Sequence, residues 1–312
     1  MPAAGVLLVD KPGGMTSHDV VARARRALGT RKIGHAGTLD PMATGLLVLG
    51  VEGATRLLTF VVGLGKSYEA TIRLGVATDS DDADGIETAR ADAASLAAVT
   101  PERIAAGVAA LTGRISQVPS TVSAIKVGGR RAYDLAREGA AVELKAREVT
   151  VSRFDVLAVR PSTSSATGGS GSGSGAAHGI DLDVVVDCSS GTYIRALARD
   201  LGADLGVGGH LTALRRTRIG AFDVADAASV DDLAAAALLE PADVAASVLG
   251  RFDVTADEAR DLRHGKRLVG AASRLSNDPT AAIDPGGVLV GVVERRGDDV
   301  KSVMNMPEEA AR

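Results

Sequence analysis

Hydrophobic residues recur along the chain in two patterns, one typical of strands and one typical of amphipathic helices. Apolar and polar positions alternate in KSYEATIRLGV (66–76), and this period of two predicts a half-buried strand. Short continuous apolar runs predict buried strands in GVLLV (5–9) and GLLVLGV (45–51). The segments 147–159 and 180–189 are also typical of strands.

Helices are indicated by the spacing of apolar residues and by capping residues before their first turns. Thr16 and Asp19 fit a capping box for the segment SHDVVARARRAL, and Gly29 is expected to end that helix. Thr100 and Pro101 open a second helix. The other expected helices are ATRLLTFVV (54–62) and TYIRALARDLGADLG (192–206).

The character of the chain changes at about residue 245. Thr255 and Glu258 fit the cap of a helix that ends at Gly265, and the strand-like segments VLVGVV and VKSVMNM follow it. We therefore expect residues 1–244 and 245–312 to form separate domains.

Two segments between the expected elements are predicted to be loops. STSSATGGSGSGSGAAHG (162–179) has low complexity and is expected to be disordered, as the tip of a hairpin within one domain. DSDDADG (79–85) resembles a calcium-binding loop, but Arg90 stands where such a loop has its bidentate glutamate. We interpret it as a solvated acidic loop.

Composition places the chain among globular proteins, with 312 residues of which 46% are hydrophobic. No apolar stretch approaches the roughly 20 residues of a membrane span, and the N-terminus lacks the basic region of a signal peptide. Cys188 is the single cysteine, so no disulfide framework is expected. These features predict a cytoplasmic protein.

The charge distribution is uneven. The net charge of −4 argues against a protein that coats nucleic acid indiscriminately. Basic residues outnumber acidic ones over residues 1–78, whereas acidic residues predominate over 79–102. The first segment could form a basic face, or both could be ordinary solvated surface.

Asp40, in GHAGTLDPMATGLL (34–47), is the strongest catalytic candidate in the sequence. Pro41 restricts the backbone of Asp40, and the flanking glycines permit conformations that other residues avoid. Such rigid presentation suits a nucleophile or a general base, although an Asp before Pro is also a common turn cap. An ionised carboxylate in a dry pocket needs a partner, and Arg195 is a candidate.

Other residues could bind a ligand or serve the fold alone. Tyr68 and Tyr193 are two of three tyrosines, and each could simply pack in the core. His35 and Lys11 could contact a ligand or belong to turns. A basic cluster follows a Pro turn and surrounds a Gly-Gly hairpin turn, and a basic run lies near Leu214 in GGHLTALRRTRIG (208–220). The basic cluster comprises Lys126, Arg130 and Arg131.

Several common chemistries lack their motifs. The chain has no GxxxxGK(S/T) phosphate loop, no HExxH zinc motif and no GxSxG nucleophile motif. One cysteine cannot build the zinc site of a base deaminase. No cofactor and no metal is therefore expected.

Taken together, the motifs resemble those of the TruB family of bacterial tRNA pseudouridine synthases. The resemblance covers about residues 5–220 and follows the family's order: DKPGGMTSHDVV, GHAGTLDPMATGLLVLGVEGATRL, KSYEATIRLGVATDSDDADG, QVPSTVSAIKVGGRRAYDLAREG, CSSGTYIRALARDLG and GGHLTALRRTRIG.

The resemblance implies an α+β fold, with a mixed, largely antiparallel sheet flanked by helices and loops. It also implies an RNA-gripping insertion at about 112–146 and a small, β-rich, PUA-like RNA-binding domain at 245–312. The loop at 162–179 departs from a typical family member.

The resemblance also implies an activity, the isomerisation of uridine 55 in the T-loop of tRNA to pseudouridine. Asp40 would be the nucleophile, Arg195 would pair with it, and Tyr68 would pack on the target base. Tyr193 and Leu214 would line the pocket, and His35 would contact RNA at the position vacated by the flipped nucleotide. Lys11, Lys126, Arg130 and Arg131 are expected to bind phosphate.

The expected partner is tRNA, bound by a monomer without a protein partner or a membrane. Whether Asp40 attacks C1′ or C6, or removes a ribose proton, stays open. Two other functions also stay open: a non-catalytic RNA-folding factor, and a nucleoside hydrolase that pairs Asp40 with Asp10 or Asp19.

Overall fold

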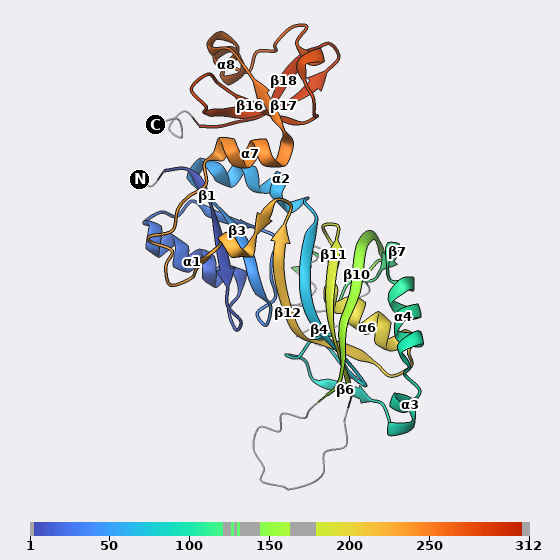
Figure 1. Cartoon of the computed structure of the whole chain (residues 1–312). Helices are drawn as coiled ribbons and strands as arrows, with labels where there is room; N and C mark the ends of the chain where they lie inside the picture. Colours follow the sequence, from blue (N-terminus) through green and yellow to red (C-terminus); the bar gives the residue numbers. More distant parts are fainter. Residues whose placement is uncertain (1–2, 121–125, 128–129, 132–143, 163–178, 308–312) are drawn as a thin grey trace. The chain divides into compact units, whose positions relative to one another are not determined.

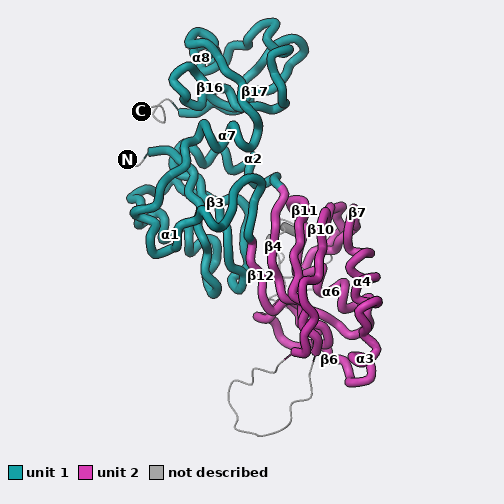
Figure 2. Tube along the Cα trace, in the orientation of Figure 1, with its two compact units in different colours: residues 1–64, 217–312 teal, residues 65–216 magenta. Residues whose placement is uncertain are grey.

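The computed structural model describes residues 3–120, 126–127, 130–131, 144–162 and 179–307 (Figure 1). The chain forms two compact units, the first made of Met1–Leu64 with Thr217–Arg312 and the second of Gly65–Arg216 (Figure 2). The predicted division at residue 245 falls within helix α7 (Pro241–Leu249) of the first unit and remains a prediction.

The N-terminal part of the first unit is built on strand β3 (Thr44–Val51). Strand β1 (Gly5–Lys11) and strand β2 (Ile33–Ala36) both run antiparallel to β3, and β14 (Ala228–Ser229) pairs in parallel with β1. The two short apolar runs GVLLV (5–9) and GLLVLGV (45–51) are thus paired strands, as predicted.

Helix α1 (Ser17–Leu28) follows β1 and confirms the predicted capping signals. The Asp19 amide donates to Thr16 Oγ1 at 3.1 Å, and the Asp19 carboxylate accepts from the Thr16 amide at 2.9 Å. Gly29 ends the helix in the left-handed conformation, with φ of 64°. The apolar face of α1 packs on Leu7, Val9 and neighbouring residues of the β1–β3 core.

The C-terminal part of the first unit is a four-stranded sheet ordered β15 (Arg251–Asp253), β16 (Thr280–Ile283), β17 (Leu289–Arg296) and β18 (Asp299–Asn305). Helix α8 (Ala256–Arg263) has the predicted capping box and contacts β17 and β18. The expected β-rich C-terminal part is therefore confirmed.

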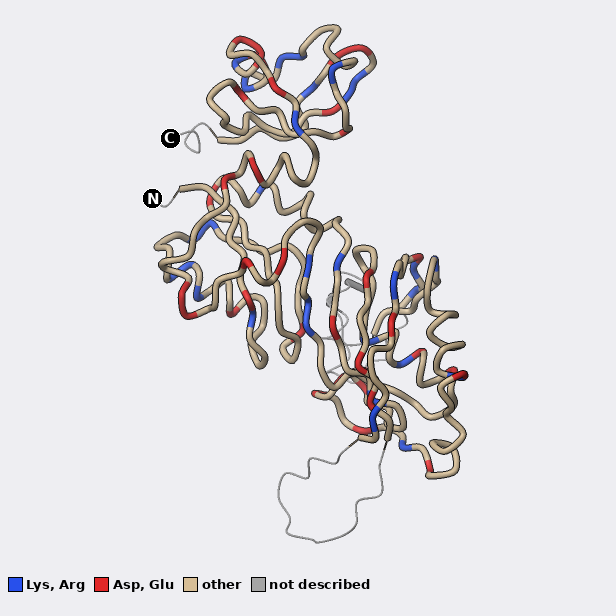
Figure 3. Tube along the Cα trace, in the orientation of Figure 1, with Lys and Arg blue, Asp and Glu red and all other residues tan. Residues whose placement is uncertain are grey.

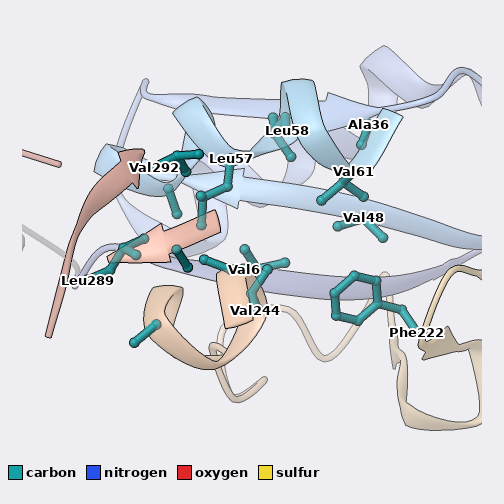
Figure 4. Close-up of a cluster of buried hydrophobic side chains, with 14 of the residues drawn as sticks. Val6, Ala36, Val48, Leu57, Leu58, Val61, Phe222, Val244, Leu289 and Val292 are labelled. Atoms are coloured by element: carbon teal, nitrogen blue, oxygen red, sulfur yellow. The ribbon is translucent and has the colours of Figure 1, made fainter. Parts of the chain in front are cut away.

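One hydrophobic cluster joins the C-terminal sheet to the N-terminal strands (Figure 4). Leu289 and Val292 of β17 share it with Val6 of β1 and with Leu57. Leu57 ends the 3-10 helix η1 (Glu52–Leu57), which continues into helix α2 (Leu58–Val62); the single helix predicted over 54–62 is thus two short ones. The cluster also includes Val244 and other residues of α7.

The second unit is a largely antiparallel sheet in the order β12 (Gly209–Ile219), β4 (Lys66–Leu74), β11 (Ile180–Cys188), β10 (Arg147–Pro161) and β7 (Gly113–Gln117). The last residues of β12 belong to the first unit and pair with β13 (Phe222–Asp223). The largely antiparallel strands of the two units, the parallel pairs β1–β14 and β15–β16 and the flanking helices confirm the predicted fold class.

The partners of β10 and β11 show where the low-complexity segment lies. Pro161 at the end of β10 pairs with Ile180 at the start of β11, so both strands belong to one hairpin, as predicted. Residues 163–178 of the segment lie outside the described residues.

Helices α4 (Pro101–Ala110) and α6 (Ile194–Asp204) contact each other and the sheet of the second unit. Gly107 of α4 permits this close packing, because a Cβ there would lie 2.6 Å from Leu201 Cδ1 of α6. Beside them lie the short helix α3 (Ala93–Ala97) and the hairpin of β5 (Val76–Thr78) with β6 (Glu87–Arg90).

Candidate functional site

Asp40 lies in the loop that joins β2 to β3, and it is half-buried. The carbonyl of Asp40 accepts from the Ala43 amide at 3.1 Å, which closes a tight turn. Ser17, the first residue of α1, holds the preceding residue: its hydroxyl accepts from the Leu39 amide at 2.9 Å and donates to the Leu39 carbonyl at 3.2 Å. Ser17 is buried, so α1 fixes the backbone next to Asp40.

Lys11 holds the other flank of the same loop from inside the fold. Its side chain is 0% exposed, and its ammonium donates to the carbonyls of Pro12, Met15 and Pro41 at 2.9, 2.6 and 3.2 Å. The carbonyl of Pro41 also accepts from Gly14. This geometry suits the turn lysine that the sequence left as an alternative to a phosphate ligand, and contact between Lys11 and RNA remains a prediction.

His35 is a half-buried residue of β2, opposite Leu49 of β3. The ring of His18, from the first turn of α1, meets the ring of His35 edge to face, with centroids 5.3 Å apart and planes at 83°. Two histidines are thus in contact here, of which the sequence suggested one.

The second unit contains the other candidates with described side chains. Tyr68 on β4 is buried, opposite Val186 of β11, and Tyr193 is half-buried at the N-cap of α6. Arg195 in the first turn of α6 is 3% exposed, and Leu214 on β12 is buried. Asp40 and His35 belong to the first unit, and an approach between them and these residues remains a prediction.

Ser80, Asp81 and Asp82 of the acidic segment are buried near Arg195, whereas residues 79, 83 and 84 are exposed, so the prediction of a solvated loop was wrong for the middle of the segment. Arg195 Nη1 donates to the Ser80 carbonyl at 2.7 Å and lies 3.5 Å from Asp82 Oδ2. Asp82 is buried, and its carboxylate also accepts from the Asp84 amide at 3.1 Å. A buried guanidinium needs such partners, and the pattern of the acidic segment alone could not reveal them.

A second arginine of α6 ties the helix to the same segment and to the end of β7. Arg199 Nη1 lies 3.3 Å from Asp81 Oδ2, and Arg199 Nη2 donates to the Val118 carbonyl at 2.7 Å. Burial raises the pKa of Asp81, and the charge of Arg199 opposes that rise. Asp81 adopts a positive φ of 62°, which Asp tolerates better than most residues.

Gln117, the last residue of β7, fixes the backbone of Tyr193 directly. Its side-chain amide donates to the Tyr193 carbonyl at 3.1 Å and accepts from the Tyr193 amide at 2.8 Å. Gln117 is 2% exposed. Sequence reasoning missed Gln117, Arg199 and Asp82, because their partners lie far away along the chain and no local signal marks them.

Two further basic side chains are buried in the second unit. Arg216, in the basic run of β12 that Figure 3 shows in blue, is 1% exposed. Burial, with a smaller contribution from Arg216, lowers the pKa of Lys66 to about 8. Part of the basic run is thus interior and cannot form a solvated face.

The structure shows the backbone pairing of the predicted basic hairpin. Strand β8 (Lys126–Val127) pairs antiparallel with β9 (Arg130–Arg131), which places Lys126 opposite Arg131. The neighbouring residues 121–125, 128–129 and 132–143 of the insertion lie outside the described residues.

Neither a metal site nor a membrane helix is found in the described part of the chain. No three His, Cys, Asp or Glu side chains there come together in a group that could hold a metal ion. No helix there has the length and apolar character needed to cross a bilayer.

Three family models match successive parts of the chain. The model described as TruB family pseudouridylate synthase (N terminal domain) matches residues 25–194. The tRNA pseudouridylate synthase B C-terminal domain matches 195–255, and the tRNA Pseudouridine synthase II, C terminal, matches 249–307.

Curated relatives match over nearly the whole chain. The tRNA pseudouridine synthase B of Leifsonia xyli subsp. xyli is 55% identical over 311 residues, which cover 99% of this chain and 98% of the relative. The tRNA pseudouridine synthase B of an Arthrobacter species is 51% identical, with 96% of each chain covered.

Solved structures share the fold at lower identity. A chain from a structure titled "Structure of H/ACA RNP bound to a substrate RNA containing 2'-deoxyuridine" has a TM-score of 0.68 and 24% identity, covering 98% of this chain and 86% of that one. A chain from a Cbf5-Nop10-Gar1 complex has a TM-score of 0.67 and 23% identity, covering 97% of this chain and 84% of that one.

Proposed function

The chain belongs to the TruB family of pseudouridylate synthases, and from this premise we propose that it isomerises uridine 55 in the T-loop of tRNA through Asp40. The relatives at 51–55% identity over nearly the full length are named tRNA pseudouridine synthase B, which identifies the class of reaction and the substrate. The anchored loop is the observation that supports Asp40: buried Ser17 and Lys11 hold the backbone on both sides of a half-buried carboxylate.

The reaction exchanges one bond for another within the same nucleotide. The N1–C1′ bond breaks, C5 bonds to C1′, the proton on C5 is lost and N1 gains a proton, so the product has the mass of the substrate. Uracil inside a folded loop is stacked, and turning it out costs a few kcal/mol. A carboxylate that forms a covalent adduct, at C1′ or at C6, divides the barrier into two smaller ones.

The other side chains are assigned to holding the base and the carboxylate. Tyr68 is proposed to pack on the flipped base, and Tyr193 and Leu214 to line the pocket. Arg195 is proposed to pair with Asp40. Its own position supports this role, since Asp82 and the Ser80 carbonyl hold its guanidinium in a buried setting.

Phosphate contacts are assigned to the basic hairpin of Lys126, Arg130 and Arg131, and RNA contact to His35. We propose that the chain acts as a monomer in the cytoplasm. The phosphate and RNA contacts would contribute the binding energy that turning the base out of its loop requires.

The substitution Asp40→Asn tests the proposal. We expect pseudouridine formation in unmodified tRNA to be abolished while the Kd for tRNA changes by less than about tenfold, because the amide keeps the shape and loses the nucleophile. Asp231→Asn, at an exposed position, is the matched control. Substantial residual turnover in Asp40→Asn would contradict the nucleophile role.

The same assay separates the two other functions. A purely RNA-folding factor would leave uridine 55 unchanged in the wild type. A nucleoside hydrolase would release free uracil. Asp19 was one candidate for its second carboxylate, and in the structure this carboxylate caps α1. A product of unchanged mass supports isomerisation.

A further inference from the structure

Among the described residues, His18 and His35 form the one contact between two histidine rings. His18 lies beside the loop that carries Asp40, since the adjacent Ser17 is bonded to Leu39. It is exposed in the first turn of α1, and His35 on β2 meets it at 5.3 Å between ring centroids. Because the planes stand at 83°, the edge of one ring meets the face of the other.

The backbone of His18 has little freedom to move relative to Asp40. The adjacent residue, Ser17, is bonded to both the amide and the carbonyl of Leu39. On its other side, Asp19 forms the capping box with Thr16. These two sets of hydrogen bonds fix the backbone on both sides of His18, next to the loop that carries Asp40.

The chemistry of the ring suits contact with RNA. A neutral imidazole offers one N–H donor, a protonated one offers two, and either can reach a phosphate oxygen. A nucleotide turned out of a folded loop brings its phosphates to the protein surface. The nearest carboxylate in sequence, Asp19, is engaged by Thr16, so it leaves the ring of His18 available.

We propose that His18 is a second RNA-binding histidine that acts beside His35, donating a ring N–H to a backbone phosphate close to the target nucleotide. The inference rests on the proposed function. It adds a residue that binds substrate without taking part in bond making or breaking, so its loss raises KM and leaves kcat nearly unchanged.

Two substitutions at the same position distinguish RNA contact from support of His35. His18→Ala removes both the N–H donor and the ring contact, whereas His18→Phe keeps an aromatic ring against His35 and removes the donor. Arg26→Ala, at the exposed far end of α1, is the control for general loss of positive charge.

The experiment measures the Kd for a labelled T-arm stem-loop RNA and the kcat and KM for pseudouridine formation in tRNA. We expect both His18 variants to weaken binding about ten- to a hundredfold, the effect of one lost hydrogen bond to a charged group, with Arg26→Ala unchanged. Wild-type affinity in His18→Phe, or equal weakening in Arg26→Ala, would overturn the inference. A wild type that binds the RNA but forms no pseudouridine would overturn the proposed function instead.

Discussion

Lys11 is a buried charged residue that holds the loop of the proposed nucleophile, Asp40. Its ammonium is enclosed and donates to three carbonyls, one of them that of Pro41, next to Asp40. Lys11→Met keeps the side-chain length and removes the ammonium that donates to these carbonyls, of which that of Pro41 keeps the bond from the Gly14 amide. We expect the free energy of unfolding to fall by about 2–4 kcal/mol in urea titrations, with kcat reduced more than KM.

Lys32→Met, at an exposed position, is the control for Lys11. Unchanged stability in Lys11→Met together with weaker tRNA binding would contradict the loop-holding role. The DKPGG motif indicated an important lysine, but the role of its ammonium depends on carbonyls that the chain brings together only when it folds.

Cys188 provides a pH-dependent test of burial at the residue scale. Its thiol is buried in β11, and burial raises its pKa from 9.0 to about 11. Between these two values the unfolded chain ionises while the folded chain keeps the proton, so the stability contributed by the thiol is lost as pH rises from about 9 to about 11. Unfolding free energies of the wild type and Cys188→Ala, measured at pH 7.5, 9 and 10.5 in urea, should therefore converge at high pH. A difference that does not change with pH would show that the thiol is solvated.

At the scale of elements, Gln117 joins the end of β7 to the start of α6. The helix carries Tyr193 and Arg195, and the side chain of Gln117 is bonded to both backbone groups of Tyr193. In Gln117→Met both of these bonds are lost, although the Tyr193 carbonyl still accepts from the Leu197 amide at 3.3 Å. We expect a loss of about 1–3 kcal/mol in stability and a fall in kcat at saturating tRNA, because Tyr193 and Arg195, which are proposed to line the site, lose their fixed position.

Ser116→Ala, one residue earlier and exposed, is expected to match the wild type in both measurements. If Gln117→Met lost stability but kept its kcat at a temperature where it is fully folded, its role would be structural alone. Arg199 offers an independent test of the same junction, since it bonds Val118 from the next turn of α6.

The elements that local signals specify were predictable, and those that depend on distant partners were not. The caps of α1 and α8 follow from Thr16 with Asp19 and Thr255 with Glu258, because a capping box is contained within four residues. The burial of Ser80, Asp81 and Asp82 in the acidic segment was not predicted, because it depends on Arg195, 115 residues from Ser80. For the same reason, the motifs indicated the candidate Arg195 but not the residues that hold it.

At the scale of the whole molecule, the change of sequence character at residue 245 does not coincide with an end of the hydrophobic core. Val6 and Leu57 belong to the N-terminal part of the first unit, and they share one cluster with Leu289 and Val292. The sequence patterns indicated that the segments carrying these residues are apolar. They could not show that the N-terminal and C-terminal residues pack on each other (Figure 4). This shared core predicts that the two parts of the first unit are coupled in stability.

A chain that ends at residue 250 tests this coupling, because it lacks β15–β18 and exposes the apolar side chains that these strands cover. We expect its thermal midpoint to fall by more than about 5 °C and its tendency to aggregate to rise, as measured by scanning calorimetry and size-exclusion chromatography. In the full chain, Leu57→Ala, at a buried position of the shared core, should cost about 2–5 kcal/mol, whereas Val269→Ala, 85% exposed, should cost almost nothing. A truncated chain as stable and as soluble as the full one would contradict this coupling.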